Sequence, residues 1–250
     1  MRLFDCNCFI GLPAVGILKP AAGAKDLLAA MDRSGIERAL VWHVVQRDYA
    51  VPTGNRLLAE AIADHRDRLV GCWGVMPEQT GELPAADDLC EQMAEANVRA
   101  LRAFPDRNRY LLRAESCGPL LDVMVERRIP LILAAQNADQ WRTAYDLLAQ
   151  YPQLVCVLSD MHVWGTDRWF RPLVEAYRHV YVELSEYILD GGIEAFVESY
   201  GADRLLFGTG FPKWDHGGVM LMLRHAEVVP GDRQAIAAGN LERILGDVRL

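Results

Sequence analysis

Residues 2–11 read RLFDCNCFIG, a short apolar run that starts almost at the first residue. The run indicates a buried β-strand, and Gly11 marks the point where it opens into a loop. Strand side chains alternate between two faces. One face is therefore expected to carry Asp5, Asn7 and Phe9, and the other Cys6, Cys8 and Ile10. No signal peptide is expected ahead of this strand.

The rest of the chain alternates between β-rich apolar runs and amphipathic helical patterns. Strands are predicted at residues 2–9, 38–43, 68–75, 98–103, 130–134, 154–159, 180–184 and 204–208. Helices are predicted at 24–34, 55–65, 86–96, 117–128, 138–151, 167–177, 191–200 and 230–245, with Asn55 as the N-cap of the second. This alternation over 250 residues predicts one closed (β/α)8 barrel domain, residues 1–250, more than an open doubly wound sheet.

Four longer connections follow strands, at 11–23, 44–54, 76–85 and 104–116. In a (β/α)8 barrel the loops after the strands form the rim of the active site. Functional side chains are therefore expected in these loops and at the carboxyl ends of the strands.

Charge and composition exclude several classes of partner. The formal net charge is −8 and no basic run is present, which argues against nucleic acid and anionic membranes as partners. The longest apolar runs are far shorter than the ~20 residues of a membrane span.

The six cysteines include no C-x-x-C pair and are expected to be reduced, mostly buried thiols of a cytoplasmic protein. Cys6 and Cys8 have the spacing of a possible metal-binding pair, but no partner cluster accompanies them, so packing in the core is the favoured interpretation for both.

Several stretches, in order along the chain, carry a family resemblance. They are DCNCF at 5–9, RSGIERALV at 33–41, DRLVG at 67–71, RALRAFP at 99–105, LLFGTGFP at 205–212 and GNLERIL at 239–245. Together they resemble the amidohydrolase superfamily, in its amidohydrolase-related branch of metal-dependent hydrolases. The resemblance spans nearly the whole chain, and it implies a TIM barrel and hydrolase chemistry.

The resemblance also implies a catalytic metal, but the ligand positions have changed. The family's first strand carries Asp-x-His-x-His, and Asn7 and Phe9 occupy its two histidine positions here. Strand five offers Gln136 in place of a histidine, strand six offers Asp160 or Met161, and Gly210 replaces the strand-eight aspartate. A divalent ion needs about three or four convergent ligands. No cofactor is therefore expected at the usual centre.

A rebuilt zinc site is the alternative. His43, His162 and His216 follow strands two, six and eight, and three histidines on one rim can bind zinc. They share no ligand spacing such as H-x-H or H-E-x-x-H, so the rebuilt site is the less favoured interpretation.

Polar residues near the strand ends are the candidates for metal-free acid–base chemistry. Asp160, His162 and Glu183 are the predicted catalytic residues, because a carboxylate beside an imidazole can orient it and raise its pKa. Substrate-binding residues are predicted at Asp5, Asn7, Arg102, Trp164, Trp214 and His216, with Arg102 suited to a bidentate contact with a carboxylate. The alternative is structural: Glu183 pairs with Arg102, and Asp160 caps a helix.

Two classes of function follow. The first is an amidohydrolase-like hydrolase or lyase acting on a small organic acid, amide or lactone without the usual metal centre. The second is a catalytically inactive barrel that binds a small molecule or a protein. A small-molecule substrate or ligand is the expected partner, and a homo-oligomer is left open.

Overall fold

The computed structural model describes residues 1–162 and 166–250. Eight parallel strands follow one another around the sheet in sequence order, each hydrogen-bonded to the next. They are β1 (Phe4–Ile10), β2 (Arg38–His43), β3 (Leu69–Gly74), β4 (Val98–Ala103), β5 (Leu131–Ala134), β6 (Cys156–Ser159), β7 (Val180–Glu183) and β8 (Leu205–Leu206). The order and direction of the strands confirm the predicted (β/α)8 barrel.

Backbone hydrogen bonds join the first strand to the last. Cys6 N donates to Phe207 O and Gly210 N donates to Asn7 O, each over 2.9 Å. These bonds bring the two edges of the sheet together, and they place Asn7 and Gly210 at the same end of the barrel.

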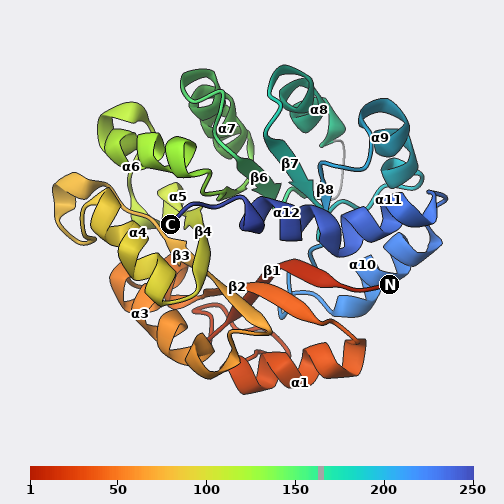
Figure 1. The fold of residues 1–250 in the computed structure, drawn as a ribbon, viewed down its shortest axis with the longest axis horizontal. Coiled ribbons are helices and arrows are strands. Elements are labelled where there is room, and N and C mark those ends of the chain that lie inside the picture. Colours follow the sequence, from red (N-terminus) through yellow and green to blue (C-terminus); the bar gives the residue numbers. More distant parts are fainter. Residues whose placement is uncertain (163–165) are drawn as a thin grey trace.

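Helices surround the strands, as Figure 1 shows. They are α1 (Ala24–Ser34), α2 (Val45–Asp48), α3 (Val51–Ile62), α4 (Ala86–Glu95), α5 (Pro105–Asn108), α6 (Ala114–Arg127), α7 (Ala138–Gln150), α8 (Asp167–Ala176), α9 (Gly192–Tyr200), α10 (His216–His225), α11 (Pro230–Gln234) and α12 (Asn240–Gly246). Short 3-10 turns at Ala63–His65 and Glu78–Thr80 and a π-helical turn at Ala235–Gly239 complete the set. Helices α2, α5 and α10 lie outside the helix ranges predicted from the sequence. None of the described helices is long and apolar enough to cross a membrane.

The first strand does not keep the strict alternation that the sequence predicts. Its register against β2 shifts between Asp5 and Cys8, which marks a β-bulge. Cys6 therefore packs inside the barrel with Phe4 and Phe9, whereas Cys8 packs in the outer cluster. A bulge adds one residue to a strand and so changes which face the following side chains occupy.

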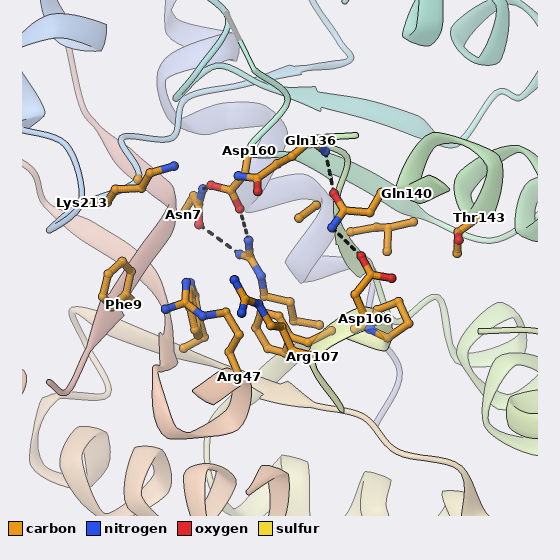
Figure 2. A pocket seen from close by; sticks show the side chains of 18 residues that line it. Asn7, Phe9, Arg47, Asp106, Arg107, Gln136, Gln140, Thr143, Asp160 and Lys213 are labelled. Atoms are coloured by element: carbon orange, nitrogen blue, oxygen red, sulfur yellow. Dashed lines mark hydrogen bonds and ion pairs between the residues drawn. The ribbon is translucent and has the colours of Figure 1, made fainter. Parts of the chain in front are cut away.

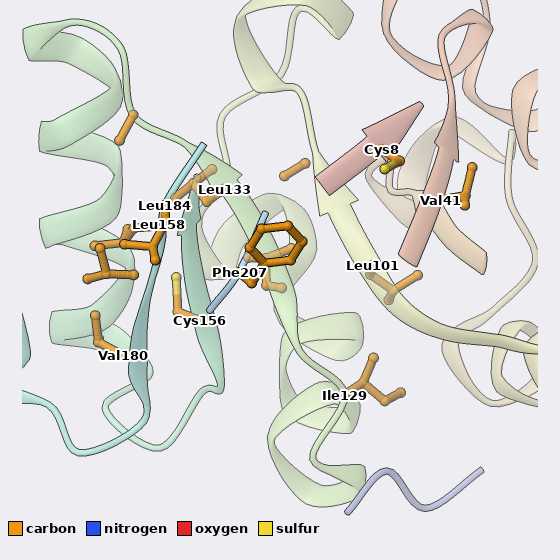
Figure 3. Close-up of a cluster of buried hydrophobic side chains, with 14 of the residues drawn as sticks. Cys8, Val41, Leu101, Ile129, Leu133, Cys156, Leu158, Val180, Leu184 and Phe207 are labelled. Carbon is orange, nitrogen blue, oxygen red and sulfur yellow. The ribbon is translucent and has the colours of Figure 1, made fainter. Parts of the chain in front are cut away.

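Two buried clusters fill the barrel and its surroundings. The inner cluster holds inward-facing strand residues together with Leu241, Ile244 and Leu245 of α12, which crosses the barrel in Figure 1. The outer cluster lies between strands and helices and includes Val41, Leu133 and Phe207 (Figure 3). All six cysteines are free and buried. Asn240 Nδ2 of α12 donates to Leu205 O at the start of β8, so α12 lies at the amino ends of the strands. The opposite end of the barrel is left for a site.

Candidate active site at the mouth of the barrel

Three side chains from different strands meet at the carboxyl end of the barrel. Asn7 comes from β1, Arg102 from β4, and Asp160 follows the last residue of β6. Arg102 Nη1 donates to Asn7 Oδ1 over 3.0 Å, and Arg102 Nη2 pairs with Asp160 Oδ2. Asn7 Nδ2 donates to Asp160 Oδ1 over 3.0 Å, which closes a ring of three side chains. Arg102 therefore pairs with Asp160 and not with Glu183.

The guanidinium of Arg102 is a buried cation. Arg102 is only 2% exposed, and an arginine side chain stays charged in proteins. Trp42 and Phe104 cover it, with ring centroids 4.9 Å and 5.5 Å from Cζ. These rings contribute cation–π attraction, while Asp160 supplies the opposite charge that a buried cation requires.

Glu183 lies behind Asn7, at the end of β7. Its carboxylate accepts hydrogen bonds from Asn7 Nδ2 over 3.1 Å, from Ser185 Oγ over 2.8 Å and from Ser185 N. Burial, together with the nearby charge of Asp160, raises the pKa of Glu183 to about 8, although the bonds from Ser185 act in the opposite direction. Burial therefore favours the protonated form of Glu183.

The close approach of Glu183 to the backbone requires glycine at position 208. A Cβ on Gly208 would lie 2.2 Å from Glu183 Oε1, so Gly208→Ala must displace the buried carboxyl group. We expect the free energy of unfolding to fall by about 1–3 kcal/mol, measured by urea denaturation. The control is Gly231→Ala, because a Cβ there meets nothing within 4 Å. Equal stability of the two variants would contradict this placement of Glu183.

A cavity of about 110 Å³ opens above the ring of Asn7, Arg102 and Asp160. Its charged lining residues are Arg47, Arg102, Arg107 and Lys213 on the cationic side and Asp106 and Asp160 on the anionic side. Figure 2 shows Arg47 and Arg107 below the cavity and Lys213 at its upper left. Cations therefore outnumber anions here, although the whole chain has a net charge of −8.

Two of these cations are on α2 and α5, outside the predicted helix ranges. Arg47 belongs to α2 and Arg107 to α5, and Asn108 Nδ2 joins the two helices by donating to Gln46 O over 3.2 Å. The sequence holds a signal for both as site residues, because both arginines fall in long connections after strands, where the rim of the site is expected. Each follows its strand by four residues.

Lys213 is held at the cavity by Glu186, which the predicted site also omits. The buried Glu186 carboxylate pairs with Lys213 Nζ and accepts from Trp214 Nε1 over 3.0 Å. Its second oxygen accepts from His162 N over 3.1 Å. One carboxylate thus joins the loops that follow β6, β7 and β8.

The aromatic side chains near the strand ends have different surroundings. Phe9, Trp42 and Phe104 line the cavity as a row of three rings. The ring centroids of Phe9 and Trp42 are 4.9 Å apart, and those of Trp42 and Phe104 are 5.1 Å apart. Trp214 is 48% exposed and lines a separate groove beside α10. Trp164 lies outside the described residues.

Of the predicted site residues, Asn7, Arg102 and Asp160 line the cavity, and Glu183 contacts Asn7 from below. Asp5 and His216 are buried but do not line it. The prediction that His162 shares a strand face with Asp160 is wrong, because β6 ends at Ser159, before both residues. Asp160 and His162 have φ of 49° and 48°, so the chain turns there and His162 lines a different hollow.

Two of the three histidines of the alternative zinc site have separate side-chain partners. His43 Nδ1 accepts from Val45 N over 3.2 Å, and His216 Nδ1 shares a 3.0 Å hydrogen bond with Ser34 Oγ. In residues 1–162 and 166–250, the one set of three or more metal-ligating side chains that converges contains His216, but neither His43 nor His162.

The donor set at the family's metal position does not fit a divalent ion. Asn7 Oδ1 and Asp160 Oδ2 already bind the Arg102 guanidinium, and Asn7 Nδ2 is a donor directed at two carboxyl groups. Gly210 has no side chain to offer. A second cation here would lie against the positive charge of Arg102, and Asp160 is the one carboxylate among Asn7, Gln136, Asp160 and Gly210.

A match to a family model identifies the family of this chain. The family model described as amidohydrolase matches residues 11–246. The chain belongs to the amidohydrolase family. No curated protein matches its sequence.

Solved structures share the fold of this chain at low sequence identity. A 2,6-dihydroxybenzoate decarboxylase from Rhizobium has a TM-score of 0.75 at 15% identity, with 98% of each chain covered. A putative 2-pyrone-4,6-dicarboxylic acid hydrolase from Pseudomonas putida has a TM-score of 0.73 at 20% identity, with 98% of each chain covered. A 5-carboxyvanillate decarboxylase from Sphingomonas paucimobilis has a TM-score of 0.69 at 15% identity, with 99% of each chain covered.

Proposed function

We propose that this member of the amidohydrolase family is a hydrolase or lyase that acts on a small organic acid, amide or lactone without a metal ion at the usual centre. One observation carries the proposal. The mouth of the barrel holds a small cavity whose floor is the ring of Asn7, Arg102 and Asp160 and whose walls carry three further cations.

The charge of the cavity favours an anionic ligand. Arg47, Arg107 and Lys213 lie on its wall, and arginine matches the planar geometry of a carboxylate. The row of Phe9, Trp42 and Phe104 offers apolar surface beside these cations. The structural relatives named above act, by their names, on carboxylic acids, which supports the same class of substrate here.

The chain supplies its own cation where the family places a metal. The Arg102 guanidinium can stabilise negative charge that develops on a substrate oxygen, because a buried, fixed cation acts strongly in a site that excludes water. Asp160 lies on the cavity wall within reach of a substrate and is the proposed acid–base group. Glu183 fixes the orientation of Asn7, since its carboxyl group and that of Asp160 both accept from Asn7 Nδ2.

A catalytically inactive barrel that binds a small acid is the second candidate. The closed hydrogen bonding of Asp160 favours it, because Oδ1 accepts from Asn7 and Oδ2 pairs with Arg102. An acid–base group needs a free lone pair or proton at the substrate. A measurement of turnover distinguishes the two candidates, since both predict that the cavity binds a small acid.

Asp160→Asn and His162→Ala test which residue carries acid–base chemistry. We expect Asp160→Asn to lower kcat by about 100-fold or more, since an amide does not take up a proton at neutral pH. We expect His162→Ala to leave kcat unchanged, because the exposed His162 side chain lies outside the cavity. The substrates are small carboxylic acids, lactones and amides, tested with and without zinc, and melting temperature is recorded alongside.

Two outcomes would count against the proposal. Ligand binding without turnover of any of these substrates supports the inactive barrel. Unchanged turnover in Asp160→Asn removes Asp160 from the mechanism.

A further inference from the structure

A second polar cluster lies on the other side of the barrel wall from the cavity. Asp5, Cys8 and His216 each place one potential ligand atom within 4.8 Å of the other two. Their exposed fractions are 0%, 0% and 2%. The bulge in β1 explains the arrangement, because the register shift between Asp5 and Cys8 gives Cys8 an outward position while Cys6 faces inward.

The carboxylate of Asp5 is buried without a cation. It accepts from Asn7 N and Thr209 N over 3.0 Å each, and from the Thr209 hydroxyl. Among the ion pairs of residues 1–162 and 166–250, none involves Asp5. A buried charge is costly unless hydrogen bonds and an opposite charge compensate it.

The imidazole of His216 has, among the described residues, one nitrogen with a hydrogen-bond partner and one without. Its Nδ1 shares a hydrogen bond with Ser34 Oγ over 3.0 Å, and the ring stacks on Phe211. Its Nε2 is buried and has no hydrogen-bond partner in the described part of the chain. An imidazole whose Nδ1 is fixed by a hydrogen bond is the usual arrangement of a metal-binding histidine.

We propose that Asp5, Cys8 and His216 bind a zinc ion, at a site separate from the family's centre. Carboxylate, thiolate and imidazole are the ligand types that zinc prefers, and the ion would neutralise Asp5 and use the free Nε2. Zinc binds such atoms at about 2.0–2.3 Å, which brings tetrahedral ligands to roughly 3.5 Å from one another. A small inward movement from the observed spacing therefore closes the site.

The Thr209 hydroxyl lies beside this site and offers a further oxygen, 4.0 Å from Cys8 Sγ. The ion would connect β1 to the first residue of α10 and so fix the segment between β8 and α10. That segment carries Lys213 to the cavity at the mouth. The role of the ion is structural, because all three ligands are buried and none lines the cavity.

Metal analysis and cobalt substitution of the full chain test the proposal. Protein from zinc-supplemented expression is expected to retain about one zinc per chain after gel filtration, and chelation is expected to lower its melting temperature by about 5 °C or more. Cobalt(II) added to the chelated protein is expected to give the near-ultraviolet charge-transfer band of a cobalt–thiolate bond. Cys8→Ser should abolish that band, and His216→Gln should weaken cobalt binding at least tenfold.

Two control variants locate the ion. Cys90→Ser removes a different buried thiol, on α4, and should leave the cobalt–thiolate band intact. Asp160→Asn alters the mouth of the barrel and should also leave it intact. Absence of stoichiometric zinc and cobalt from folded wild-type protein would overturn the proposal, as would a cobalt complex that survives in Cys8→Ser but disappears in Asp160→Asn.

Discussion

Arg102→Met is expected to lower the free energy of unfolding by about 3–5 kcal/mol. The substitution keeps much of the aliphatic volume but removes the cation that pairs with Asp160 and donates to Asn7. Asp160 is then left as a partly buried charge without its partner, and Asn7 Oδ1 loses its donor. Urea denaturation at neutral pH measures the change.

The same variant is expected to lose catalysis. A fixed donor to developing negative charge is worth about 10²–10³ in kcat, so turnover should fall at least that far. Arg99→Met is the matched control, because Arg99 lies on the same strand and its Nη1 donates over 3.4 Å to the Val248 carbonyl, away from the mouth of the barrel. A stability change no larger than that of Arg99→Met would mean that Arg102 is not the central cation of the site.

Glu183→Gln is expected to change how stability depends on pH. The pKa of Glu183 is raised from 4.5 to about 8 in the folded protein by burial and by Asp160. The folded state therefore binds this proton more tightly than the unfolded state. The stabilising contribution is fully present below pH 4.5 and is lost as the pH rises towards 8. A pKa difference of this size corresponds to on the order of 5 kcal/mol.

The measurement compares unfolding free energies of wild type and Glu183→Gln at several pH values between 4.5 and 8. The advantage of the wild type over the variant should shrink steadily with rising pH, because glutamine does not titrate. Glu198→Gln, at an exposed position of α9, is the control and should track the wild type. A difference that stays constant across this range would show that Glu183 does not hold the proton.

The sequence predicts the barrel well because the evidence for it is repeated along the chain. Each strand is a short apolar run, and the limits of β2 and β4 agree with the predicted ranges 38–43 and 98–103. Asn7, Arg102 and Asp160 could be predicted at the mouth because every strand of a parallel barrel ends there. Position along a strand thus identifies candidates without knowledge of their contacts.

The remaining features depend on interactions that periodicity does not encode. The bulge in β1 and the left-handed conformations of Asp160 and His162 are set by tertiary contacts, and they decide which side chains face the cavity. Asn55, predicted as an N-cap, lies inside α3, where its side chain bonds both N and O of Gly74. The start of α10 was missed because two glycines follow His216, and glycine weakens the helix signal.

A crystal structure of the protein grown with zinc, with anomalous data collected at the zinc edge, tests the account most directly. We predict no anomalous peak between Asn7, Gln136, Asp160 and Gly210, where the Arg102 guanidinium should instead bind Asn7 and Asp160. A zinc ion bound there by Asp160, with Arg102 displaced, would contradict the account.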